Sequence, residues 1–192
     1  MRTTRAYSIV IFVLLVLSLT ACGNNGENSL SAQARNVCGS WAYIHDRETP
    51  VAVFHENGSA EYDDVRYSFE CEDGFILLTD KKGNTTKVRY ELDDDGMLLY
   101  RSTKYSYSGD TKPDGLIGQW TCPETSWTFE FTGAGTFLED GYFPGLYTLD
   151  EQNKTFTLIY NDQFEDTVCY YSLEGDMLCI EYPWRMVKTA TK

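Results

Sequence analysis

The residues of this chain that could perform catalysis are few, and their spacing matches no known constellation. His45 and His55 are the two imidazoles, and neither lies in a motif. A serine or cysteine nucleophile needs a base that a third group orients, and the sequence has neither a Gly-x-Ser-x-Gly elbow nor a catalytic-cysteine signature. Carboxylates are abundant, but most lie in turn sequences. We therefore expect no catalytic residue and no enzyme, with a hydrolase whose carboxylates meet only in three dimensions as an alternative.

The best candidate for a metal site is Asp93-Asp94-Asp95-Gly96, which matches part of a calcium-binding loop. Asp93, Asp95 and Gly96 fit loop positions three, five and six, but the closing bidentate acid falls on Ser102. An acidic hairpin turn is the better interpretation. The sequence also has no phosphate-binding glycine pattern and no zinc-type Cys/His pairs, so we expect no metal and no other cofactor.

Five cysteines follow residue 22, and their odd number leaves at least one thiol unpaired. They are Cys38, Cys71, Cys122, Cys169 and Cys179. Cys169 and Cys179 flank the turn sequence Glu174-Gly175-Asp176, which makes a bridge across that hairpin conceivable. The alternative is that all five are small buried hydrophobic residues. The sequence does not choose between these arrangements.

The N-terminal segment has the layout of an export signal. Arg2 and Arg5 precede an almost wholly apolar run over residues 6–19, which is shorter than the roughly 20 apolar residues of a membrane-spanning helix. Leu19-Thr20-Ala21-Cys22 follows and resembles the lipobox of bacterial lipoproteins. In that family the cysteine thiol receives a diacylglyceryl group and the chain is cut just before it. The alternative is an ordinary secretory signal in which Cys22 has no role.

The resemblance to lipoproteins implies where the protein resides. It implies a signal peptide over residues 1–21, a palmitate-type lipid on Cys22, and attachment to the outer face of a bacterial cell membrane, or to the outer membrane of a Gram-negative cell. Two or three acyl chains hold a protein firmly on a bilayer without spanning it. The polar residues 22–36 are expected to form a flexible tether.

The composition limits the partners. The full chain has a formal charge of -13, and removal of residues 1–21 takes away two arginines and no acid, which makes it -15. Because nucleic acids and anionic lipid head groups need basic patches, we expect neither as a partner. We expect contact with the membrane through the lipid anchor and, as a further partner, an unidentified protein of the cell envelope.

Short alternating runs rich in aromatic residues and separated by Gly or Asp turns predict an all-β protein. The chain also repeats itself at about 80 residues: Gly39-Ser40-Trp41 corresponds to Gly118-Gln119-Trp120, and Tyr67 is aligned with Tyr147. We expect repeat 1 over residues 37–105, a linker over 106–115 and repeat 2 over 116–192, each an antiparallel meander.

Some details of the strands can be predicted as well. The first repeat should contain one long strand over residues 59–69, and the last strand of the second, near 177–188, should be interrupted at Pro183. Alternation places Val51 and Val53 on the inner face of one strand, and Phe129 and Phe131 on the inner face of another.

The Gly-x-Trp that opens each repeat resembles the entry motif of lipocalin-like β-barrels, including small domains of unknown role in lipoproteins of Gram-positive bacteria. In that family the Trp closes one end of the barrel and an Arg of the last strand lies over its ring. The resemblance covers residues 38 to 188 and implies two tandem small barrels, with Arg101 over Trp41 and Arg185 over Trp120 as barrel-closing pairs.

These observations favour a non-catalytic, lipid-anchored protein that binds something at the cell envelope. An acidic, aromatic-rich β surface favours a protein partner. The residues expected to form that surface are Tyr62, Tyr105, Tyr107, Tyr142 and Tyr160. A carrier of a small apolar ligand in a barrel cavity and an envelope hydrolase with a carboxylate pair are the alternatives.

Overall fold

The computed structural model describes residues 30–189 with the exception of 112, 162 and 163. The predicted signal peptide, Cys22 and most of the tether lie outside the described residues. Within the part of the chain that is described, no helix is long and apolar enough to cross a membrane.

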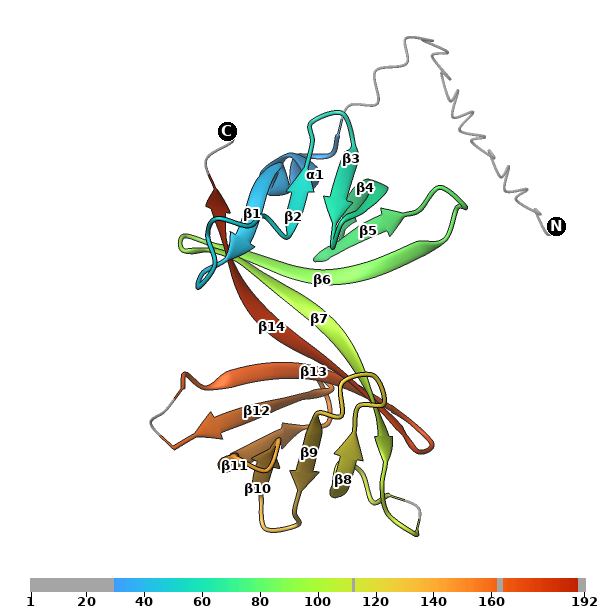
Figure 1. Cartoon of the computed structure of the whole chain (residues 1–192), viewed down its shortest axis with the longest axis vertical. Helices are drawn as coiled ribbons and strands as arrows, with labels where there is room; N and C mark the ends of the chain where they lie inside the picture. The colour runs from blue at the N-terminus through green and yellow to red at the C-terminus, as the bar shows by residue number, and fades with distance from the viewer. Residues whose placement is uncertain (1–29, 112, 162–163, 190–192) are drawn as a thin grey trace, which may run out of the picture.

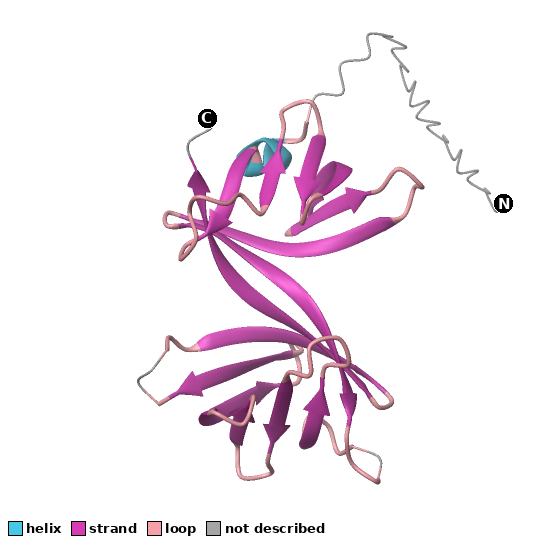
Figure 2. Cartoon of the chain, viewed as in Figure 1, coloured by secondary structure: helices cyan, strands magenta, loops and turns pink. Residues whose placement is uncertain are grey.

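The described chain is almost entirely β-structure (Figures 1 and 2). It starts with one short helix, α1 (Ala32–Val37). The strands of the first half are β1 (Gly39–Tyr43), β2 (Ala52–Phe54), β3 (Ser59–Tyr62), β4 (Val65–Glu72), β5 (Phe75–Thr79), β6 (Thr85–Asp93) and β7 (Gly96–Tyr107). Those of the second half are β8 (Gly118–Thr121), β9 (Thr128–Phe131), β10 (Thr136–Glu139), β11 (Phe143–Asp150), β12 (Thr155–Tyr160), β13 (Thr167–Glu174) and β14 (Met177–Thr189).

Each strand pairs with the next in antiparallel fashion, and β14 pairs with β1, so the fourteen strands form a ring. The prediction of an all-β antiparallel meander is therefore confirmed. In addition, β14 pairs with β7, from Met97 opposite Met186 to Ser106 opposite Met177. This long two-stranded ribbon crosses the ring and divides it into two lobes (Figure 1). The first lobe contains β1 to β6, and the second contains β8 to β13.

Each lobe has its own apolar core. In the first lobe Trp41, Phe54 and Phe69 are among the buried residues, and in the second Trp120, Phe131 and Phe156 are. The cores do not follow the two halves of the sequence, because Met186 of β14 is in the first core and Tyr105 of β7 is in the second. The expected boundary between residues 105 and 106 thus falls inside β7, and each half contributes the end of its last strand to the lobe of the other half.

The Gly-x-Trp motifs have a common structural explanation. The indole Nε1 of Trp41 donates to the carbonyl of Val37, and that of Trp120 donates to the carbonyl of Leu116, both at 2.7 Å. Each indole is therefore tied to the segment that precedes its strand.

The covering side chain on each indole comes from the last strand of the opposite half. Lys188 Nζ lies 5.2 Å from the centre of the Trp41 ring, and the ring of Tyr107 lies edge-on to Trp120 at 5.2 Å. A Cβ at Gly39 would approach Lys188 to 3.4 Å, and one at Gly118 would approach Tyr107 to 2.4 Å. The glycine of each motif makes room for the residue that covers the tryptophan.

The two arginines expected on these rings lie elsewhere. Arg101 donates to the Tyr43 hydroxyl and, at 2.8 Å, to Asp63 Oδ2. Arg185 donates to both oxygens of Asp93 in the first lobe. The prediction assigned β7 to Trp41 and β14 to Trp120, whereas Lys188 of β14 covers Trp41 and Tyr107 of β7 covers Trp120, because the ends of the two strands are exchanged between the lobes.

Other local predictions need correction. The expected strand over residues 59–69 is two strands, β3 and β4, because Asp63 and Asp64 adopt positive φ of 47° and 62° in a tight turn. β14 continues through Pro183, which lies between the end of the pairing with β13 at Glu181 and the start of the pairing with β1 at Met186. The missing N–H of proline therefore breaks no ladder on the side of β13 and β1, and on the other side Pro183 stays opposite Tyr100 of β7.

The end of the expected tether is also ordered. Ser31 Oγ accepts a hydrogen bond from the backbone N–H of Ala34 at 3.1 Å and caps α1. Ala34 and Val37 are buried in the first core. The fold of the described chain thus begins at this helix.

The lobes also contact each other beside the ribbon. The guanidinium of Arg89 on β6 lies 3.7 Å from the ring centre of Tyr170 on β13, and its Nε is 2.8 Å from Glu181 Oε2 on β14. Tyr100 packs edge-to-face on Tyr170 at 5.3 Å. We call Arg89, Tyr170 and Glu181 the inter-lobe clamp.

Candidate functional site

A groove of about 850 Å³ lies between the two lobes. Its first-lobe wall includes His45 and Arg47 from the connection after β1, together with Arg185 of β14. Its second-lobe wall includes Glu139 and Phe164. Because the lobes share the β7–β14 ribbon, the two walls are held at a fixed spacing by paired backbone and not by a flexible linker.

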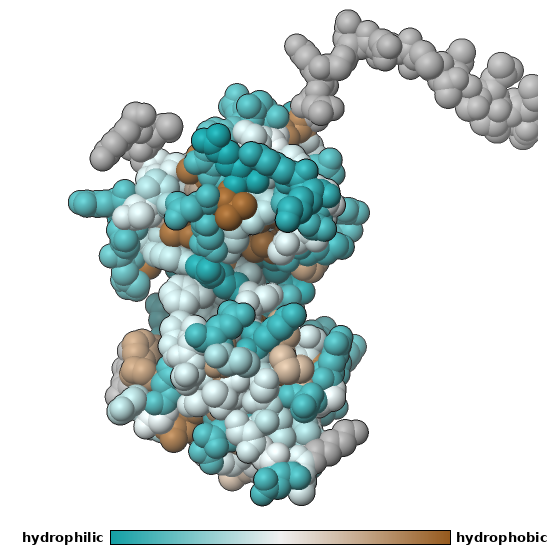
Figure 3. All heavy atoms as spheres, turned by 45° about the vertical axis from the view of Figure 1, so that its right-hand side comes forward, coloured by the Kyte–Doolittle hydropathy of each residue, from teal (hydrophilic) through white to brown (hydrophobic). Residues whose placement is uncertain are grey.

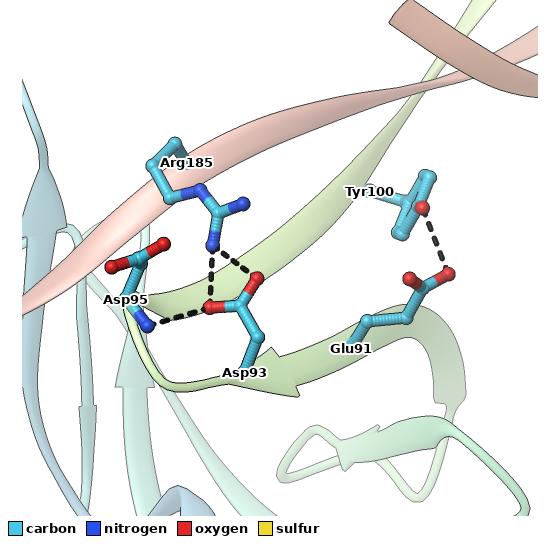
Figure 4. Close-up of polar contacts among 5 residues, drawn as sticks. All are labelled: Glu91, Asp93, Asp95, Tyr100 and Arg185. Carbon is cyan, nitrogen blue, oxygen red and sulfur yellow. Dashed lines mark hydrogen bonds and ion pairs between the residues drawn. The ribbon is translucent and has the colours of Figure 1, made fainter.

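The first-lobe wall is fixed by an ion pair at the turn between β6 and β7 (Figure 4). Arg185 Nη1 lies 2.7 Å from Asp93 Oδ1 and 2.6 Å from Oδ2, and Asp93 Oδ1 also accepts the backbone N–H of Asp95 at 3.0 Å. The hydrogen bond from Arg185 lowers the pKa of Asp93. Nearby, Tyr100 donates to Glu91 Oε1 at 2.9 Å.

The same turn is the calcium-loop fragment of the sequence. Its first acid is occupied by Arg185 and by the turn backbone, which is the geometry of an acidic hairpin turn. Among the described residues no group of three or more His, Cys, Asp or Glu side chains is placed to hold a metal ion.

A smaller cavity of about 390 Å³ adjoins the groove, and we call it the aromatic pocket. Its walls contain six aromatic side chains: Tyr105, Trp127, Phe129, Phe164, Tyr182 and Trp184. They also contain two carboxylates, Glu139 and Asp140. None of the described residues that line it is Lys or Arg.

Several of these aromatic rings are incompletely covered by the protein. Trp127 is 49% exposed, Phe164 is 55% exposed and Trp184 is 38% exposed. Large apolar side chains are more commonly buried, and a group of exposed ones beside a cavity is typical of a binding site. The aromatic pocket therefore offers apolar surface that the fold itself does not use.

Glu139 is the polar centre of the aromatic pocket. It is the last residue of β10 and points to the inner side of the second lobe, where Tyr160 donates to its Oε2 at 2.6 Å. Burial raises the pKa of Glu139, and the Tyr160 hydrogen bond acts in the opposite direction. Oε1 has no hydrogen-bond partner among the described residues, and it is free to accept one from a ligand.

Asp140 has a different role. It is the turn residue after β10, with a positive φ of 51°, and its Oδ1 accepts the backbone N–H of Thr128 at 2.7 Å. This bond ties the turn after β10 to the start of β9.

The cysteines form no disulfide within the described chain. The bridge between Cys169 and Cys179 that the sequence left open is not formed, because the register of the hairpin places Ser172 opposite Cys179, and Cys169 is offset to the other face. Cys169 is fully buried, and burial raises the pKa of its thiol.

The tyrosines expected on the surface are mostly not there. Tyr105 and Tyr160 are buried, Tyr62 and Tyr107 are half-buried, and Tyr142 is 82% exposed. On the face drawn in Figure 3 the first lobe carries strongly hydrophilic side chains, whereas the second lobe is mainly of intermediate hydropathy.

Reasoning from the sequence missed Glu139, Trp127, Phe164, Tyr182 and Trp184. One signal was available for Glu139. Phe129, Phe131 and Phe137 alternate on the inner face, and the same alternation carries Glu139 inward. A carboxylate on a core face is an unusual position and a pointer to function.

Comparison with known proteins gives no further guide. No protein-family model matches the chain, and neither curated proteins nor solved structures include a match. Function is therefore inferred from the residues and their geometry.

Proposed function

We propose that this protein is a lipid-anchored, non-catalytic binding protein on the outer face of a bacterial cell membrane, and that it holds a small ligand in the aromatic pocket. The observation that carries the proposal is the convergence of six aromatic side chains on one cavity at the junction of the lobes. The lipobox at Leu19–Cys22 supports the anchor.

We further propose that the two lobes descend from two lipocalin-like barrels. The paired Gly-x-Trp motifs and the same order of strands in each lobe support this. The ligand of the alternative carrier function would lie inside a barrel, but aromatic side chains such as Phe131 and Phe156 fill the interior of the second lobe. The pocket between the lobes is the better place for a ligand.

A protein partner remains a second candidate, supported by exposed side chains on the second lobe. Tyr142 is 82% exposed, Leu146 51% and Val168 45%. The hydrolase alternative is less favoured. Glu139 and Asp140 are adjacent residues rather than groups on opposite sides of a cleft, and Asp140 is engaged by the Thr128 backbone.

The anchor is tested by replacing Cys22. We expect Cys22→Ala to abolish labelling by radioactive palmitate and to move the protein out of the membrane fraction. The control is Cys38→Ala, which should remain labelled and membrane-bound. Continued labelling of Cys22→Ala would contradict the anchor.

Ligand binding is tested by native mass spectrometry of the protein purified from its own host. We expect an added mass that is lost from Trp127→Ala and kept in Tyr142→Ala. Both replacements remove an exposed aromatic ring, but only Trp127 lines the aromatic pocket. A bound mass that both variants retain would place the ligand elsewhere.

A further inference from the structure

The two lobes differ at one pair of equivalent positions. Leu99 pairs with Tyr90 in the first lobe, and Ile180 pairs with Tyr171 in the second, so the strands superpose with Tyr182 in the place of Arg101. Arg101 and Tyr182 also lie directly opposite each other in the ribbon. Side chains paired in this way emerge on the same face of a sheet. From there Arg101 turns toward the first lobe and Tyr182 toward the second.

In the first lobe the guanidinium of Arg101 fills this space. It binds Asp63 Oδ2 at 2.8 Å and the Tyr43 hydroxyl. Asp63 is the turn residue that corresponds to Asp140, since β3 and β10 pair in the same way with their neighbours and both aspartates have positive φ, 47° and 51°. The first lobe thus supplies its own cation next to a carboxylate and tyrosines.

In the second lobe the corresponding space has the carboxylates but lacks that cation. Tyr182 stands where Arg101 would be, and Glu139 stands where the first lobe has Tyr62. The result is the aromatic pocket, which has two carboxylates and, among its described lining residues, no basic side chain of the Lys or Arg type. His45 also lines the pocket, but no lysine or arginine among the described lining residues gives its two carboxylates a permanent positive partner.

We infer that the aromatic pocket binds a small organic cation of the alkylammonium class, in the position that the Arg101 guanidinium occupies in the other lobe. This rests on the proposed function and names the class of ligand. Aromatic faces attract such cations, the more so as alkyl groups replace the N–H groups that water would bind, and Glu139 supplies the counter-charge. The acidic mature chain, with a charge of -15 once residues 1–21 are removed, raises the local concentration of cations.

Glu139 is well suited to this role. Tyr160 holds its Oε2 at 2.6 Å and fixes the carboxylate toward the cavity, while Oε1 has no partner among the described residues. The exposed faces of Trp127 and Trp184 provide the rings against which the alkyl groups pack. An ammonium ion between these rings and Glu139 would be contacted on several sides.

The experiment uses the full-length mature protein in nanodiscs of phosphatidylglycerol, a lipid without a choline head group. Calorimetric titrations compare choline with 3,3-dimethylbutanol, a neutral molecule of nearly the same shape. We expect choline to bind at least about tenfold more tightly than the neutral analogue. We expect Glu139→Gln to remove about this tenfold preference for the cation, while Gln keeps an acceptor for Tyr160.

Two control variants, Glu130→Gln and Tyr142→Ala, separate the role of the pocket residues from general effects. Glu130→Gln removes an exposed carboxylate from the outer face of β9 and should leave choline binding unchanged. Trp127→Ala should weaken choline binding, whereas Tyr142→Ala should not. A circular dichroism spectrum of each variant shows that it is folded.

The outcomes distinguish this inference from the proposed function. If the neutral analogue binds as tightly as choline and Glu139→Gln affects neither, the pocket binds ligands but the cation inference is wrong. If neither probe binds, the cation inference is wrong, and the proposed function then stands or falls with the native mass spectrometry alone. A repeat in nanodiscs that contain phosphatidylcholine identifies the source of the cation: competition with free choline indicates a lipid head group, and no competition indicates a free solute. Both results support the ligand class.

Discussion

The two lobes solve the same geometric problem with different chemistry. In each, a residue of the central ribbon points to the space beside a turn aspartate: Arg101 toward Asp63 in the first lobe, and Tyr182 toward Glu139 and Asp140 in the second. The arginine completes an internal polar contact, whereas the tyrosine leaves a cavity of about 390 Å³ with uncovered aromatic rings. The comparison supports the proposal that the second lobe binds a ligand at the place where the first lobe carries its own cation.

The comparison of the two lobes assumes that they unfold as one cooperative unit. The two replacements with the largest expected effect on stability test this assumption. Trp41→Ala and Trp120→Ala each remove a fully buried indole and its 2.7 Å hydrogen bond. Each should lower the free energy of unfolding by about 3–5 kcal/mol. Because β7 and β14 contribute to both cores, urea denaturation followed by circular dichroism should show one transition in both variants.

Independent lobes would behave differently. Each variant would then show two transitions, of which only the one that belongs to the altered lobe would shift. Ser108→Ala, which changes an exposed residue after β7, serves as the control and should leave the curve nearly unchanged.

The sequence predicts the broad fold because the repeat and the strand pattern are local signals. Phe129 and Phe131 were assigned correctly to the inner face of β9. In β2 the same reasoning failed: Ala52 and Phe54 are the buried residues, Val53 between them is only half-buried, and Val51 precedes the strand and is partly exposed beside the core. In a strand of three residues a shift by one exchanges the faces, and local alternation cannot decide between two apolar sets.

The site was harder to predict because it depends on long-range pairing. The exchange of strand ends brings Lys188 to Trp41 and Tyr107 to Trp120, contacts between opposite halves that no local pattern encodes. The predicted alignment of the repeats was also shifted by two residues at this point, because the structural equivalent of Tyr147 is Phe69 and not Tyr67. Tyr147 packs edge-on to Phe131 at 5.1 Å, and Phe69 packs edge-on to the equivalent Phe54 at 5.0 Å.

A transplant between the lobes sharpens the comparison directly. Tyr182→Arg introduces into the second lobe the residue that fills the first. Its guanidinium should reach Glu139 and Asp140, occupy the aromatic pocket and weaken choline binding at least about tenfold in a calorimetric titration. Tyr182→Phe keeps the ring and should retain binding. Undiminished binding by a folded Tyr182→Arg protein would show that the two positions are not functionally equivalent.

The inter-lobe clamp tests how far the ribbon alone holds the lobes together. Arg89→Gln removes a guanidinium that lies 3.7 Å from the Tyr170 ring and pairs with Glu181 at 2.8 Å, in a partly buried setting. We expect a loss of about 1–2 kcal/mol in the free energy of unfolding, with one transition retained. Arg66→Gln is the control, since its ion pair with Glu61 is exposed and should contribute little. Equal effects of the two would mean that the clamp adds nothing to the ribbon.

The smallest expected effect concerns pH, where two carboxylates should act with opposite sign: Asp93, which pairs with Arg185 of the first-lobe wall, and Glu139 of the second-lobe wall. The Arg185 hydrogen bond lowers the pKa of Asp93, so its stabilising contribution is present at neutral pH and is lost as the pH falls through the folded-state pKa. Burial raises the pKa of Glu139, so its ionised form destabilises the fold at neutral pH and acidification removes this penalty.

The groups around Glu139 do not reverse the upward shift of its pKa. They are Tyr105 on β7, Tyr160 on β12, Cys169 on β13, Tyr182 on β14, the adjacent Asp140, and His45 from the first-lobe wall. Urea denaturation at a series of pH values should show wild-type stability falling toward that of Asp93→Asn as the solution is acidified, and rising relative to Glu139→Gln over the same range. If acidification changed the stability difference from Asp93→Asn and the stability difference from Glu139→Gln in the same direction, the opposite pKa shifts of the two carboxylates would be contradicted.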